Sequence, residues 1–160
     1  MILSKNTIKI SLVITATLIV YFLALTLLDV SDNVIYSFLN APIMAIGLFF
    51  IIRESYREKT SQFKYMEGFT SGLAGGFLAT ILFTVFMAIY LLEIHPSLVE
   101  EMSASLPLAT GTGNMEILLF IFLSGISTAV VSSLLIIPIY KRSWNTSTIR
   151  KNQKPLHQDF

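Results

Sequence analysis

Three uncharged polar residues, Asn40, Thr84 and Thr128, lie within long apolar stretches of this 160-residue sequence. An amide or hydroxyl in such surroundings needs a hydrogen-bond partner. It either lines a path for a solute or ion, or bonds to a neighbouring helix and holds that helix in place. The sequence favours the second interpretation without excluding the first. Pro42 follows Asn40 closely and is expected to kink its helix.

Acids and histidines, which move protons and bind metals, lie outside these apolar stretches. Glu93, His95, Glu100 and Glu101 form one cluster, but their spacing matches no metal-binding motif and is typical of a solvated loop. The chain has no cysteine, and no nucleotide-binding loop, nucleophile elbow or zinc-protease motif occurs. We therefore expect no catalytic residue, no cofactor and no metal site, and the absence of buried carboxylates disfavours a proton-coupled transporter.

The composition excludes a free soluble globule. Hydrophobic residues make up 54% of the chain and charged residues only 13%, whereas soluble domains carry about 25% charged residues. The net charge of +1 shows no basic bias, so no nucleic-acid partner is expected. The principal partner predicted by this composition is the lipid bilayer.

Four stretches without charged residues or histidine are long enough to cross a bilayer, which takes about 20 residues. They are Ile10–Leu28, Val34–Ile52, Gly68–Leu92 and Ile117–Tyr140. The sequence therefore predicts an all-α, polytopic membrane protein. A four-helix transmembrane bundle would occupy residues 1–142, and a basic cytoplasmic tail residues 143–160.

The charges are divided unequally between the two sides of this predicted bundle. All 11 lysines and arginines fall on the side that holds both termini, and none falls on the other. The positive-inside rule then places both termini in the cytoplasm. In the tail, Lys141, Arg142 and Trp144 either bind lipid headgroups or act only as a topology signal.

The outer loop between the third and fourth spans begins with His95-Pro96-Ser97, a typical helix start. Leu98, Val99, Met102 and Leu106 then form an amphipathic stripe. We expect a short helix there, lying on the outer membrane surface or over the mouth of the bundle.

The third predicted span carries a small residue at every fourth position from 68 to 88. Small side chains let membrane helices approach closely, and the fourth span offers a matching row. The row serves either packing within one chain, which we favour, or association of two chains. The predicted packing residues are Gly68, Gly72, Gly75, Gly76, Ala79, Thr80, Gly125 and Ala129.

Three segments carry a family resemblance: "IIRESYREK", "FKYMEGFTSGL" and "IYLLEIHPSLVEEM". Over Ala45–Met102 the chain resembles an uncharacterised bacterial family of four-span integral membrane proteins, known only as a domain of unknown function. The family's outer loop is longer and more charged than "PLATGTGN" here. The resemblance implies the bacterial cytoplasmic (inner) membrane and supplies no activity or functional residue.

Three functions are consistent with these features. The first is a non-enzymatic accessory or structural subunit that packs against a membrane partner, or against a second copy, through small-residue helix faces. The second is a small oligomeric permease or channel with a path lined by Asn40, Thr84 and Thr128. The third is an accessory to envelope lipid or glycan synthesis, supported only by the predicted location and basic inner face.

Overall fold

A computed structural model describes residues 4–28, 36, 38–58, 65–99 and 113–140. Every regular element in these ranges is helical, as the sequence predicts. The longest are α1 (Lys5–Leu27), α3 (Asn40–Glu58), α4 (Tyr65–Ile89) and α6 (Asn114–Ile136). The π-helical turn η1 (Tyr90–Ile94) extends α4, and the 3₁₀ turn η2 (Ile137–Tyr140) extends α6.

Local chemistry sets several helix ends. Ser4 caps α1, and its hydroxyl accepts a hydrogen bond from the Thr7 N–H at 3.2 Å. At the C-terminal end of α4, η1 ends with a 2.8 Å hydrogen bond from the His95 N–H to the Tyr90 carbonyl. Pro138 has no N–H to continue an α-helix, and it lies in η2, where the winding changes.

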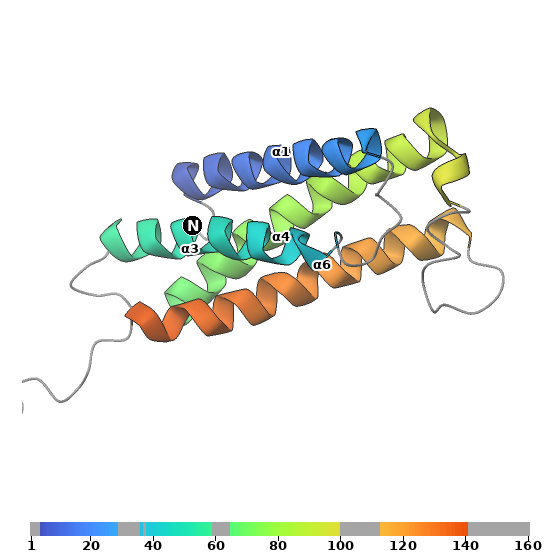
Figure 1. The fold of residues 1–160 in the computed structure, drawn as a ribbon. Helices are drawn as coiled ribbons and strands as arrows, with labels where there is room; N and C mark the ends of the chain where they lie inside the picture. The colour runs from blue at the N-terminus through green and yellow to red at the C-terminus, as the bar shows by residue number, and fades with distance from the viewer. Residues whose placement is uncertain (1–3, 29–35, 37, 59–64, 100–112, 141–160) are drawn as a thin grey trace, which may run out of the picture.

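The four long helices alternate in direction (Figure 1). Ser11 lies beside Gly75 and Thr15 beside Ala79, so α1 and α4 run parallel. α3 runs against both, because its late residue Glu54 contacts Asn6 near the start of α1. α6 is antiparallel to α4 and runs in the same direction as α3.

Three helical segments are long and apolar enough to cross a membrane: Lys5–Leu27, Tyr65–Ile94 and Asn114–Tyr140. α3 does not qualify by itself, because its last turns carry Arg53, Glu54, Arg57 and Glu58. Part of the predicted second span, residues 34–35 and 37, lies outside the described residues. The described structure thus supports a membrane-helical protein and leaves the four-span count as a prediction.

The predicted outer-loop helix lies mostly outside the described residues. Its beginning is present as one turn, in which the Leu98 N–H donates to the His95 carbonyl and the Val99 N–H to the Pro96 carbonyl, each at 3.2 Å. Leu98 and Val99 are buried against the bundle core. The remaining residues, 100–112, are not described.

α4 contacts each of the other long helices, and the buried residues between positions 68 and 80 of α4 are all small. Around it, Leu48 and Ile52 of α3 and Ile117 of α6 are almost completely buried, as is Met87 of α4 itself. Large apolar side chains also cover the outside of the bundle: Leu27 is 85% exposed and Leu135 70%. Such an outer surface suits lipid rather than water.

Candidate functional site

Helices α4 and α6 approach each other closely along an interface we call the α4–α6 seam. A Cβ atom placed on Gly76 would lie 2.6 Å from the Cβ of Ala129, and one on Gly72 would lie 2.7 Å from the Ser133 hydroxyl. One further helical turn along, a Cβ on Gly125 would lie 2.6 Å from the Thr80 methyl. These positions advance four residues at a time in opposite directions, so the two small-residue rows face each other along the seam.

On its other side, α4 is bonded to α1. The Ser11 hydroxyl donates to the Gly75 carbonyl at 3.0 Å, and the Thr15 hydroxyl donates to the Ala79 carbonyl at 3.4 Å. Each hydroxyl also bonds to the carbonyl four residues earlier in its own helix. Both hydroxyls are therefore satisfied inside the bundle and join two helices.

The sequence prediction did not include Ser11 and Thr15. A signal was present, because Thr7, Ser11 and Thr15 recur every fourth residue of the sequence that forms α1. In the structure all three are buried. Gly47 on α3 was also missed, and the Ile14 side chain occupies the place where its Cβ would lie. A single glycine in an apolar helix gave no indication of which neighbour it meets.

The predicted packing residues lie inside one chain. Gly68, Gly72, Gly75, Gly76, Ala79, Thr80 and Ala129 are buried, and Gly125 is half-buried. α3 covers part of the row, since Ile52 contacts the position of a Gly72 Cβ and Leu48 that of a Gly76 Cβ. Neighbours in the same chain therefore already occupy these faces.

The three predicted path residues are not joined by hydrogen bonds. Thr128 is half-buried, and its hydroxyl donates to the Ser124 carbonyl at 2.9 Å. The Asn40 Oδ1 and Thr84 Oγ1 atoms are buried and form no hydrogen bond with described residues. The same holds for the Ser133 hydroxyl in the α4–α6 seam. Pro42 falls in the first turn of α3, where its missing N–H removes no bond within that helix. The expected kink in the second span stays a prediction, because part of the segment before α3 lies outside the described residues.

The charged positions singled out in the sequence form no centre in the described part of the chain. Glu93 and His95 are exposed, with the His95 ring stacked 6.3 Å from that of Tyr90. Glu100, Glu101, Lys141, Arg142 and Trp144 lie outside the described residues. Within the described ranges, no three histidine or acidic side chains are grouped as metal ligands.

The fold and its close-packed seams define a helical protein of the membrane type, with three helices able to cross a bilayer. The chain belongs to the family described as "Protein of unknown function (DUF4199)", whose sequence profile matches residues 9–141. The resemblance seen in the sequence, to a domain of unknown function, is thereby confirmed. No curated protein and no solved structure matches the chain.

Proposed function

We propose that this chain is a non-enzymatic integral membrane protein that crosses the bilayer four times, with both termini in the cytoplasm. The parallel arrangement of α1 and α4 carries the proposal. If two consecutive spanning helices run the same way, the chain between them has to return across the membrane. α3 lies between them in sequence and runs in the opposite direction.

The distribution of charge supports the same orientation. The bond between Asn6 and Glu54 brings the start of α1 to the end of α3. Lys5 and Lys9 therefore share one end of the bundle with Arg53 and Arg57. Basic residues collected at one end favour a cytoplasmic location for that end.

Single cysteines test this topology, because the chain contains none of its own. Ser31→Cys and Ser103→Cys should react with a membrane-impermeant maleimide in intact cells. Ser61→Cys and Ser147→Cys should react only after the membrane is opened. If Ser31→Cys and Ser61→Cys were labelled from the same side, the second crossing would be disproved.

Within the membrane we propose an accessory or structural role, in which α6 packs against a partner protein or a second copy. The buried hydroxyls of Ser11 and Thr15 hold helices together rather than line a path. Ser124 and Ser127, in contrast, are exposed near the middle of α6, and their hydroxyls form no hydrogen bond with described residues. Polar groups at this depth usually face protein, so this face of α6 favours a covering helix.

A bulky substitution on α6 tests the accessory role. We expect the native chain, purified in mild detergent, to run as a complex larger than one copy, and Ser127→Trp to dissociate it. Ala16→Trp, on an exposed position of α1, is the matched control and should leave the complex intact. A monomer without partner in a native nanodisc would contradict the role.

The alternative function, a small permease or channel, has one observation in its favour. Asn40 and Thr84 each bury a polar atom without a partner. Ile52 meets Gly72 and Leu48 meets Gly76, and continuing this antiparallel register by eight residues places Asn40 at the level of Thr84. Water or a polar solute at that level would satisfy both atoms.

Flux measurements distinguish the two functions. Liposomes containing the protein should take up glycerol or K⁺ faster than empty liposomes if the alternative is correct, and Asn40→Leu should abolish the difference. Thr17→Val, which alters an exposed hydroxyl bonded only to its own helix, is the control. Under the accessory proposal, neither solute should enter faster than into empty liposomes.

A further inference from the structure

An open groove of about 690 Å³ runs between α1 and α3, and all its lining residues belong to these two helices. On each helix the lining residues recur at intervals of three or four positions, so one face of α1 forms one wall and one face of α3 forms the other. The floor is formed where Gly47 meets Ile14, because the absence of a side chain at Gly47 lets the helices approach.

Most of the groove is apolar and faces the surroundings of the bundle. Val13 on α1 is 64% exposed, and Ile46 and Phe50 on α3 also present exposed apolar surface. Between Lys9 and Thr17 the groove follows α1 for about 12 Å, at about 1.5 Å per residue. This length is close to one leaflet of the bilayer, whose hydrocarbon core is about 30 Å thick in total.

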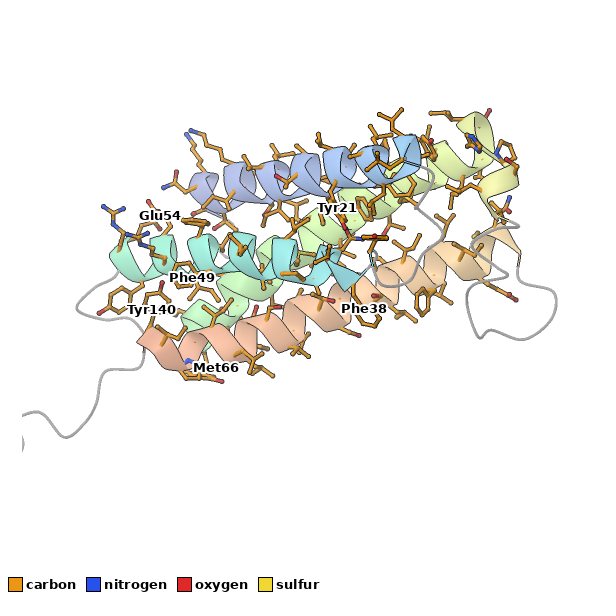
Figure 2. The ribbon with its side chains drawn as sticks, in the orientation of Figure 1. Tyr21, Phe38, Phe49, Glu54, Met66 and Tyr140 are labelled. Carbon is orange, nitrogen blue, oxygen red and sulfur yellow. The ribbon has the colours of Figure 1, made fainter. Side chains whose placement is uncertain are left out.

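One end of the groove is cationic. Lys9, Arg53 and Arg57 line it together with a single acid, Glu54, which gives a formal charge of +2 there. Glu54 already contacts Arg57 at 3.8 Å and accepts a hydrogen bond from Asn6 at 3.3 Å. Figure 2 shows Glu54 at the end of α3 on the side facing α1.

Lys9 and Arg53 are therefore available to an anion at this end. Neither forms a hydrogen bond or ion pair with another described residue. The neighbouring acid, Glu58, is not part of the lining and accepts a hydrogen bond from Asn6 at 3.2 Å.

We propose that the groove binds one anionic glycerophospholipid of the cytoplasmic leaflet. An acyl chain would lie along Val13, Ile46 and Phe50, and the phosphate would be held by Lys9 and Arg53. The charge selects an anionic headgroup, and the exposed apolar walls select a ligand that is already dissolved in the bilayer. The inference rests on the membrane embedding proposed above, but not on the accessory role.

Lipid titration of the full chain in detergent, followed by native mass spectrometry, tests the site. We expect phosphatidylglycerol to bind at least tenfold more tightly than phosphatidylcholine. Lys9→Gln and Arg53→Gln should each weaken phosphatidylglycerol binding about fivefold, the equivalent of about 1 kcal/mol per basic residue. Lys5→Gln, one helical turn from the groove, is the matched control and should change binding less than twofold.

The apolar part has its own pair of variants. Val13→Trp fills the groove and should weaken the binding of both lipids. Val20→Trp lies on the same face of α1 beyond the groove, is equally exposed in the native chain, and should have no effect. Melting temperatures of all variants establish that they remain folded.

Several results would overturn the lipid site. Equal affinity for the two lipids would remove the headgroup selection, and equal effects of Lys5→Gln and Lys9→Gln would indicate general surface attraction. Competition by inorganic phosphate at concentrations equal to the lipid would indicate an anion site without a chain-binding groove. None of these results changes the cysteine labelling pattern, so the failure of the lipid site and the failure of the four-span topology are distinguishable.

Discussion

At the scale of single residues, the absence of a side chain matters most at Gly76. Its position faces the Cβ of Ala129, and the backbone Cα of that residue lies only 3.6 Å from where a Cβ would be. A backbone atom cannot move aside as a flexible side chain can. Any larger residue at position 76 therefore has to separate α4 from α6.

We expect Gly76→Leu to lower the free energy of unfolding by about 3 kcal/mol, because it overpacks a contact with the Ala129 backbone. The measurement is unfolding of the purified protein in increasing dodecyl sulfate. Gly113→Leu is the matched control: nothing lies within 4 Å of that position, so the same change should cost less than about 1 kcal/mol. Equal loss in both variants would contradict this account of the α4–α6 seam.

At the scale of elements, α1 is attached to α4 by hydroxyl groups as well as by apolar packing. Ser11 and Thr15 each bond to a carbonyl of α4. At the far end of the pair, the Phe22 ring packs edge-on against Tyr90 at 5.2 Å. Figure 2 also shows Phe49 of α3 beside Tyr140 of η2, whose ring centres are 5.9 Å apart. Polar bonds thus join α1 to α4, and aromatic contacts join helices at both ends of the bundle.

Removal of the Ser11 hydroxyl should weaken the attachment of α1 measurably but modestly. Hydrogen bonds between membrane helices contribute about 0.6 kcal/mol on average, so Ser11→Ala should lower the free energy of unfolding by about that amount. Thr17→Val removes a hydroxyl bonded only within α1 and should have a smaller effect. A loss for Thr17→Val as large as that for Ser11→Ala would argue against an inter-helix role.

At the scale of the whole molecule, the bundle has apolar surface on its outside as well as inside. Exposed large side chains occur on every long helix, among them Val20, Ile46, Val85 and Leu123. A protein in water avoids such a continuous apolar exterior, whereas hydrocarbon tolerates it. The exterior therefore indicates which solvent the fold requires.

We expect the protein to remain in the membrane fraction after washing at alkaline pH and to need detergent for extraction. The physical reason is the apolar exterior, which would drive aggregation in water. Centrifugation of carbonate-washed membranes, followed by detection of the chain in pellet and supernatant, is the measurement. Release of monodisperse protein into the supernatant would contradict the membrane assignment.

Much of the architecture followed from composition and spacing. Long apolar runs between charged loops determine helices, because an apolar backbone segment satisfies its own hydrogen bonds only as a helix in lipid. The outer-loop helix and the tail anchors of Lys141, Arg142 and Trp144 stay predictions, since they lie wholly or mostly outside the described residues.

Only the tertiary structure decided which neighbour each small residue meets. The fourth span carries two candidate rows, and the structure places Gly125, Ala129 and Ser133 against α4 while Ser124 remains exposed. It also brought Lys9 and Arg53, 44 positions apart in the sequence, to one end of a groove. Residue spacing indicates that a helix has a face of small side chains. Which neighbour that face contacts depends on how helices distant in the sequence cross, and no local pattern contains this information.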